Sequence, residues 1–217
     1  MTNITQTVWN LISQDPTIQK NLQKNLINVR ALAKYLITHH GLKASIDSVI
    51  SAVRRYPSSR TFKENVSEIK EVFISANIST KNNLACLVLR NQSDIQRYLS
   101  EITKLTDFEK RETLRMIKGK NNLKIVTDMG SLQKIKDIFS GAQQFETKEG
   151  LGEIRIVTSD IKADKTKGVA ARISNELLTN DINISELIFC VPEIIVYVDQ
   201  KDLLKAHESI MQLCKGG

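Results

Sequence analysis

The sequence GVAARISNELLTNDINISE, residues 168–186, followed by EIIVYVD, residues 193–199, decides the fold. Behind the leading glycine, apolar side chains recur at helical spacing, which predicts an amphipathic helix. The β-branched segments 182–191 and 194–198 then predict two paired strands, hinged at Pro192.

Further elements flank this stretch. Residues 153–159 predict a strand before it, and Leu203 begins a helix after it whose apolar stripe includes His207. The order strand, helix, strand, strand, helix is typical of a ferredoxin-like α+β sandwich. The preceding segment predicts a similar unit, with a half-buried strand over 69–79, a turn at 80–83, a buried strand over 84–89, a helix over 95–102, a strand over 123–127 and a helix capped by Ser131.

The first 60 residues predict helices only. Asn28 is expected to cap a helix that ends at Gly41, and Ser45 to cap the next helix. Two short amphipathic helices joined by a tight turn are a helix-turn-helix candidate. The predicted fold class is therefore α+β, with a basic helix-turn-helix-like domain over 1–62 and two ferredoxin-like βαββαβ units over 63–149 and 150–217.

Positive charge is concentrated in the predicted helical domain. Residues 1–60 contain eight Lys and Arg residues against two acidic residues, whereas the whole chain has 31 against 24. Such asymmetry indicates a module that faces a polyanion, although a basic surface that only favours solubility is the alternative. The second helix of a helix-turn-helix enters the major groove of DNA. Ala52 is expected on its outward side, and nucleic-acid contacts are predicted for Lys43, Ser48, Ser51, Arg54, Arg55 and Arg60.

The polar turn from Asp160 to Gly168 is the candidate ligand site, since it carries three lysines and ends at a predicted helix. Free N–H groups at a helix N-terminus favour an anion such as the carboxylate of an amino acid. Glycine would let a ligand approach the backbone, and Thr166 is expected to cap the helix. A surface loop without a ligand is the alternative.

The segment from Gly168 to Glu186 resembles the ACT domain, a regulatory ferredoxin-like module, and the resemblance extends over residues 151–215. It rests on the Gly-Val start, the helix ending near Leu178 and the Asn-Ile strand. The resemblance implies edge-to-edge pairing into a homodimer or higher homo-oligomer, and amino-acid binding by the first strand–helix loop and the start of the second strand. By position, the implied ligand-binding residues are Asp164, Lys165, Gly168, Val169, Ala170, Asn183 and Ile184.

The sequence departs from the ACT pattern in two ways. Lys167 stands where the family often has proline, in a loop that is long, which leaves the identity of the ligand open. The fourth strand is also missing, because only residues 215–217 follow the last helix. We expect a strand from elsewhere, such as 69–78, to complete the sheet.

The sequence offers little for catalysis. The histidines at 39, 40 and 207 form no triad, the three cysteines form no metal-ligand or disulfide pattern, and no phosphate-binding glycine loop is present. Adjacent helical histidines point about 100° apart and do not easily share a metal ion. No segment has the roughly 20 apolar residues of a membrane span. We therefore expect a cytoplasmic, non-enzymatic protein without a cofactor.

The leading hypothesis is a regulator of amino-acid metabolism that binds duplex DNA and senses an amino acid or a similar small ligand. An RNA-binding or ribosome-associated protein is an alternative, although aromatic residues, which stack on bases, make up only 5% of the chain. A regulatory subunit that binds a protein partner and an enzyme with an unrecognised site are the others.

Overall fold

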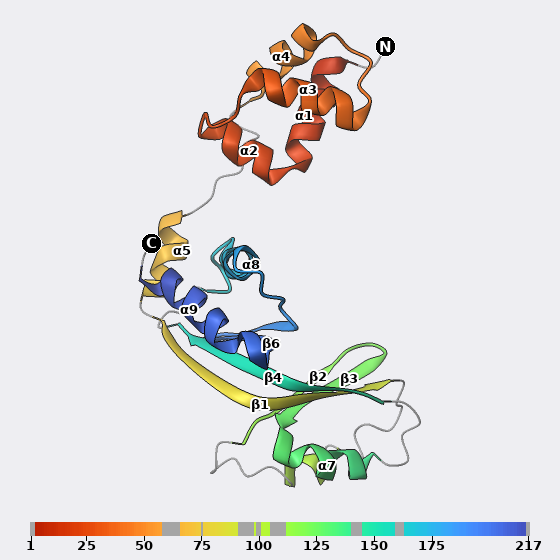
Figure 1. Ribbon diagram of the computed structural model, residues 1–217, viewed down its shortest axis with the longest axis vertical. Coiled ribbons are helices and arrows are strands. Elements are labelled where there is room, and N and C mark those ends of the chain that lie inside the picture. The colour runs from red at the N-terminus through yellow and green to blue at the C-terminus, as the bar shows by residue number, and fades with distance from the viewer. Residues whose placement is uncertain are drawn as a thin grey trace. The chain divides into compact units, whose positions relative to one another are not determined.

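The computed structural model describes residues 3–57, 66–74, 76–90, 98, 101–104, 112–139, 145–158 and 163–215. The chain divides into two compact units, residues 1–64 and 65–217, named here the N-terminal domain and the body (Figure 1). Each has its own apolar core. In the described residues, no helix is both long and apolar enough to cross a bilayer.

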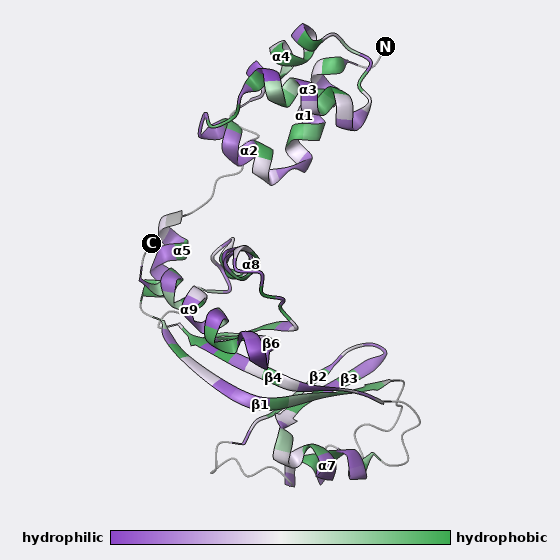
Figure 2. Cartoon of the chain, viewed as in Figure 1, coloured by the Kyte–Doolittle hydropathy of each residue, from purple (hydrophilic) through white to green (hydrophobic). Residues whose placement is uncertain are grey.

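The N-terminal domain is helical throughout residues 3–57, apart from its connections. Its helices are α1 (Ile4–Gln14), α2 (Pro16–Gln23), α3 (Val29–His40) and α4 (Ile46–Arg54). Each of these helices carries both hydrophilic and hydrophobic residues (Figure 2). Helices α1, α3 and α4 form the core with the buried residues Val8, Ile12, Leu32, Ala33, Leu36, Val49, Ala52 and Val53.

Both predicted ends of α3 and the predicted start of α4 are confirmed. Asn28 Oδ1 accepts hydrogen bonds from two N–H groups of the first turn of α3, at 3.0 and 3.1 Å. Gly41 ends α3 in the left-handed conformation with φ +59°, which glycine adopts without steric cost. Ser45 Oγ accepts a hydrogen bond from the N–H of Ser48 at the start of α4.

The body is built on an antiparallel sheet whose strand order is β2-β3-β1-β4-β6-β5. Its strands are β1 (Asn77–Arg90), β2 (Leu114–Lys118), β3 (Asn122–Asp128), β4 (Phe145–Val157), β5 (Glu186–Cys190) and β6 (Glu193–Asp199). Among the described residues, its helices with complete bounds are α5 (Val66–Ile74), α7 (Met129–Ile138), α8 (Val169–Thr179) and α9 (Leu203–Cys214), with the 3-10 helix η2 (Gln200–Asp202) before α9. Residues 101–104 are also helical.

Strands β1 and β4 are shared by two ferredoxin-like units. Residues 84–90 of β1 pair with β3, whereas residues 77–81 pair with the end of β4. Residues 151–157 of β4 pair in turn with β6. The two units therefore have the strand orders β2-β3-β1-β4 and β5-β6-β4-β1. The expectation that a strand from elsewhere completes the second unit is confirmed, with residues 77–81 in that position.

The predicted strand over 69–79 is wrong for most of its length, because residues 66–74 form α5. The segment carries both an alternating pattern and a helical one. The strand interpretation placed Phe73 on the polar face and Ile74 on the apolar face. Phe73 is instead 1% exposed and Ile74 63% exposed, since α5 buries Ile69, Val72 and Phe73 at steps of three and one.

The predicted turn at 80–83 is also wrong, because β1 passes through these residues. The polar sequence marks an irregularity of the strand instead. The pairing of β1 with β4 shifts between Lys81 and Leu84, and Asn83 has φ +60°. This irregularity lies where β1 changes from one unit to the other.

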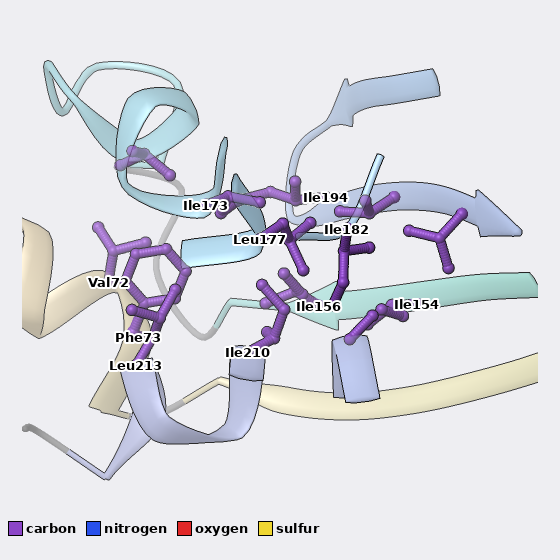
Figure 3. Close-up of a cluster of buried hydrophobic side chains, with 14 of the residues drawn as sticks. Val72, Phe73, Ile154, Ile156, Ile173, Leu177, Ile182, Ile194, Ile210 and Leu213 are labelled. Atoms are coloured by element: carbon purple, nitrogen blue, oxygen red, sulfur yellow. The ribbon is translucent and has the colours of Figure 1, made fainter. Parts of the chain in front are cut away.

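Helices cover the outer face of each half of the sheet. Helices α5, α8 and α9 pack on the second unit around Ile154, Ile156 and Ile194 (Figure 3). Helix α7 packs on the first unit, and lies on the opposite side of the sheet from α8 and α9 (Figure 1). The predicted cap Ser131 is wrong, because α7 begins at Met129.

The helix-free faces of the two halves pack against each other. The sheet order places β3 and β5 far apart, yet Lys124 of β3 forms an ion pair with Glu186 of β5. The long strands β1 and β4 are strongly curved (Figure 1). Between the halves lies a third apolar cluster of Leu84, Cys86, Val126, Leu151, Ile195 and Tyr197.

Candidate functional site

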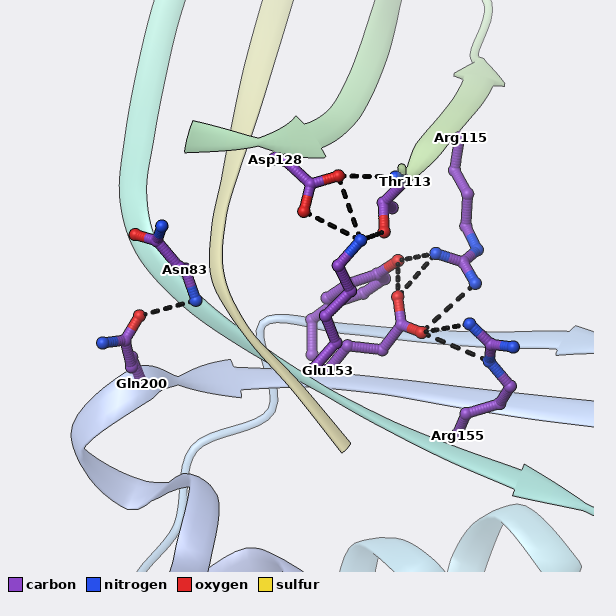
Figure 4. A network of polar contacts seen from close by, with 9 residues as sticks. Asn83, Thr113, Arg115, Asp128, Glu153, Arg155 and Gln200 are labelled. Carbon is purple, nitrogen blue, oxygen red and sulfur yellow. Dashed lines mark hydrogen bonds and ion pairs between the residues drawn. The ribbon is translucent and has the colours of Figure 1, made fainter. Parts of the chain in front are cut away.

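A buried carboxylate lies between the two halves of the sheet. Glu153 of β4 is 1% exposed. Arg115 of β2 donates hydrogen bonds to its two carboxylate oxygens at 2.5 and 3.2 Å, and the Tyr197 hydroxyl of β6 donates at 2.8 Å (Figure 4). Arg155 donates to the same carboxylate at 3.3 Å. One side chain thus connects strands β2, β4 and β6.

A second polar cluster lies beside the irregularity of β1. Asp128, at the end of β3, accepts a hydrogen bond from the N–H of Thr113 at 2.5 Å. Lys81 forms an ion pair with Asp128 at 2.8 Å and donates to Thr113 Oγ1 at 2.8 Å (Figure 4). These contacts hold β1 to the residues that flank β2 and β3.

Both polar clusters join neighbouring elements of the sheet through satisfied hydrogen bonds. Burial first, and the charge of Glu153 second, raise the pKa of Tyr197 well above its ordinary value, so the phenol remains a donor. In the described residues, every buried side-chain nitrogen or oxygen has a hydrogen-bond partner. The sequence gives one weak signal of this network, the alternation of Glu153 and Arg155 with buried isoleucines.

The predicted ligand loop lies at the start of α8. Asp164, Lys165 and Ala170 are exposed, and Val169 is buried. The predicted cap Thr166 is wrong, because Gly168 occupies the N-cap position and has no side chain with which to bond the first-turn N–H groups. Loop residues 159–162 lie outside the described residues.

Gly168 has a structural reason to be glycine. Its φ of +99° is unfavourable for other residues, and a Cβ atom there would lie 3.0 Å from Ile69 Cδ1 of α5. The close approach that the sequence suggested for a ligand is therefore made, on this side, by the chain itself.

The two predicted ligand residues before β5 are placed differently from each other. Asn183 is exposed, whereas Ile184 is half-buried and packs against the same apolar cluster as Val169. The fold thus brings the start of α8 and the approach to β5 to one core. In the described residues, no hydrogen bond or ion pair joins residues 164–168 to residues 183–184.

Four of the predicted nucleic-acid contacts are exposed around α4, namely Lys43, Ser48, Ser51 and Arg54. The expectation that Ala52 points outward is wrong. Ala52 is fully buried, and its carbonyl accepts a hydrogen bond from Trp9 Nε1 at 2.9 Å. The apolar side of α4 is therefore wider than the sequence suggested.

The remaining two predicted contacts differ from these four. Arg55 is exposed, and its guanidinium donates to the Ser51 carbonyl at 3.2 Å and to Thr5 Oγ1 at 3.4 Å. Arg60 lies outside the described residues.

The adjacent histidines contact an aromatic ring. The ring centroids of Tyr35 and His39 are 4.5 Å apart, and those of Tyr35 and His40 are 6.4 Å apart. Throughout the part of the chain that the structure describes, no group of three His, Cys, Asp or Glu side chains could hold a metal ion.

Solved structures of aspartate kinase subunits are similar to this chain. An aspartokinase α and β subunit structure matches at 18% identity with a TM-score of 0.52, over 64% of this chain and 97% of that chain. The ligand-free regulatory subunit of aspartate kinase from Thermus thermophilus matches at 12% identity and 0.52, over 65% and 98%. The aspartate kinase of Clostridium acetobutylicum matches at 20% and 0.53, over 63% of this chain but only 34% of that chain.

No protein-family model matches the sequence, and no curated protein sequence is similar to it. At these identities the structural likeness concerns the fold alone. It agrees with the α+β, ferredoxin-like arrangement of ACT-like units predicted from the sequence.

Proposed function

We propose that this chain is a non-enzymatic regulatory protein whose ACT-like body binds an amino acid or a similar small anionic ligand, and whose N-terminal domain binds duplex DNA. The single observation that carries the sensing half is the likeness of the fold to regulatory subunits of aspartate kinase. The positive charge of the N-terminal domain supports the proposed binding of DNA.

The proposed ligand site is the start of α8. The N–H groups of a first helical turn that lacks a side-chain cap favour a carboxylate, and Lys165 adds positive charge beside them. Because Ile69 packs on Gly168, the ligand approaches along the helix axis rather than over the glycine. Asp164 is a partner for the ammonium group of an amino acid, and Asn183 and Ile184 complete the proposed site.

Calorimetric titration of the full chain with each of the twenty amino acids tests the sensing half. At least one is expected to bind, and Lys165→Ala is expected to weaken that binding about tenfold or more. Lys205→Ala, an exposed lysine on α9, is the matched control. If none of the twenty amino acids binds, the sensing half of the proposal is wrong.

Homodimer formation is part of the proposal. Strands β2 and β5 are the outer strands of the described sheet, so each offers an edge on which a second copy can pair. Light scattering across a range of protein concentrations measures the assembly. A chain that remains monomeric with and without bound amino acid would contradict this part.

The proposed DNA surface consists of the exposed residues around α4. Arg54 and Arg55 are expected to contact phosphates, so their joint replacement by alanine should weaken binding to duplex DNA and flatten its salt dependence. Retention on DNA is compared at two salt concentrations. The double variant Lys201→Ala/Lys205→Ala removes the same charge from the body and should have no effect.

The fold disfavours the RNA-binding alternative. Ferredoxin-like domains that bind RNA stack bases on the open face of the sheet. Here the helix-free faces of the described strands pack on each other, with Val126 and Tyr197 fully buried between them. That face is therefore not a platform for bases.

A further inference from the structure

The N-terminal domain has a pocket lined by residues that the proposed function does not use. Its volume is about 360 Å³, and it lies between α2, the following connection and the start of α3. Most of its wall is apolar, formed by Ile18, Leu26, Ile27, Ala31, Leu32 and Tyr35.

The rim of this pocket exposes large apolar side chains. Leu26 is 70% exposed and Tyr35 is 44% exposed, although both lie beside the core of a small helical domain. The ring centroids of His39 and Tyr35 lie 4.5 Å apart, so the imidazole is in contact with the Tyr35 ring. An exposed apolar patch around a hollow is typical of an interaction site.

Three exposed cations lie in the segments that form the pocket, outside its lining. Arg30 and Lys34 are exposed and lie one helical turn apart on α3, and Lys34 lies one turn from the lining residue Ala31. Lys24 is exposed at the end of α2. These three cations favour a partner with carboxylates placed on either side of an apolar residue.

The one carboxylate in the pocket lining does not oppose this charge strongly. Asp15 Oδ1 accepts hydrogen bonds from the N–H groups of Thr17 and Ile18, at 2.8 and 3.0 Å, as the cap of α2. A carboxylate that is engaged by a helix N-terminus is partly neutralised by the helix dipole.

From this arrangement we infer that the pocket docks a short acidic, amphipathic segment of a partner protein. One or two apolar side chains of the segment enter the hollow between Leu26 and Tyr35, and its carboxylates pair with Lys24, Arg30 and Lys34. The apolar wall favours a protein segment over nucleic acid, because a phosphate backbone has no apolar side chains to bury there. The pocket lining also contains none of the residues proposed to bind DNA, which belong to α4 and to the segments on either side of it.

Fluorescence anisotropy with the full-length chain tests this inference. The probe is a labelled helical peptide with Leu and Phe at positions i, i+3, i+4 and i+7 and Glu at the other positions. Two matched peptides replace either its apolar residues by Ser or its Glu residues by Lys. The acidic apolar peptide is expected to bind about tenfold or more tightly than either of them.

Variants of the rim locate the binding. Leu26→Ser removes apolar surface with little effect on the core, because the side chain is largely exposed, and Lys34→Glu reverses one rim charge. Each should weaken binding of the acidic peptide about tenfold or more. Leu204→Ser, at a position 79% exposed on α9, is the control and should leave binding unchanged.

Four results would overturn the inference. The Lys peptide could bind as well as the Glu peptide, or Leu26→Ser could leave peptide binding unchanged. A loss of DNA retention in Leu26→Ser would assign the pocket to nucleic acid, and a loss of self-association in the same variant would make a second copy the occupant. Arg54→Ala is expected to leave peptide binding intact, so failure of the DNA proposal and failure of this one are distinguishable.

Discussion

Glu153 is the residue on which the contact between the sheet halves depends most. Its carboxylate is buried and accepts hydrogen bonds from Arg115, Arg155 and Tyr197. Glu153→Gln keeps the shape of the side chain but removes its charge. The new amide N–H₂ group then faces the donors that the carboxylate had accepted from, and it cannot accept from them. We expect the free energy of unfolding of the body to fall by about 1–3 kcal/mol, measured by urea denaturation followed by circular dichroism.

The matched control is Glu149→Gln in the same strand. The Glu149 side chain is 54% exposed and lies 3.8 Å from Lys136. Exposed ion pairs of this kind contribute little, so a change below about 0.5 kcal/mol is expected. Equal losses in the two variants would show that burial of Glu153 has no special importance.

Tyr197 carries a prediction about alkaline pH. Its pKa is raised above its ordinary value by burial and by Glu153, whereas the unfolded chain releases the proton near pH 10. Above about pH 10 the unfolded state therefore binds fewer protons than the folded state, and stability falls as the pH rises. The difference in unfolding free energy between wild type and Tyr197→Phe should narrow above that pH. A difference that is constant with pH would contradict the prediction.

At the scale of the element, α5 and α8 are held together at Gly168. An alanine there meets both the unfavourable φ of +99° and Ile69 Cδ1 at 3.0 Å. Gly168→Ala should destabilise the body by about 1–3 kcal/mol in urea denaturation. Ile69→Val removes the contacting methyl group, so the double variant should lose less than the sum of the single variants.

Gly150→Ala is the control for the Gly168 variant, because φ there is +70° and no atom lies within 4 Å of the added Cβ. It should show the backbone penalty alone, about 1 kcal/mol, and no coupling to Ile69→Val. Coupling of the same size at both glycines would exclude the Ile69 contact as the cause.

Elements with local signals could be predicted from the sequence. The ends of α3 and α4 follow from Asn28, Gly41 and Ser45, whose roles need only neighbouring residues. The strand predicted over 69–79 is wrong because its apolar residues fit both the alternation of a strand and the spacing of a helix. Only tertiary packing, which buries Phe73 and exposes Ile74, selects the helix.

The candidate sites also differ in whether local sequence signals could locate them. The exposed loop at the start of α8 and the exposed residues of α4 could be located from helix ends and charge. The Glu153 network could not, because Arg115 and Tyr197 lie 38 and 44 residues away in the sequence. Tyr197 lies opposite Glu153 in the pairing of β4 with β6, whereas Arg115 of β2 meets Glu153 only after the sheet has curved over itself.

At the scale of the whole molecule, the N-terminal domain and the body have separate cores. We therefore expect residues 1–64 to fold alone, as judged by helical circular dichroism and a cooperative thermal transition. Trp9 is the only tryptophan of the chain, so its fluorescence reports this domain selectively. Its transition midpoint should agree within error in the fragment and in the full chain. An unfolded fragment would show that the domain depends on the body.

Coupling between the two units is the last prediction, and it rests on the proposed function. A regulator that binds an amino acid in the body and DNA through the N-terminal domain must bind DNA differently when the ligand is present, by about 5- to 150-fold for a useful switch. Linkage requires that DNA change the affinity for the amino acid by the same factor, which calorimetry with and without duplex DNA measures. The fragment 1–64 should bind DNA with no response to the amino acid. If both ligands bind the full chain and neither affinity changes, the two units act independently and the regulatory mechanism proposed here is wrong.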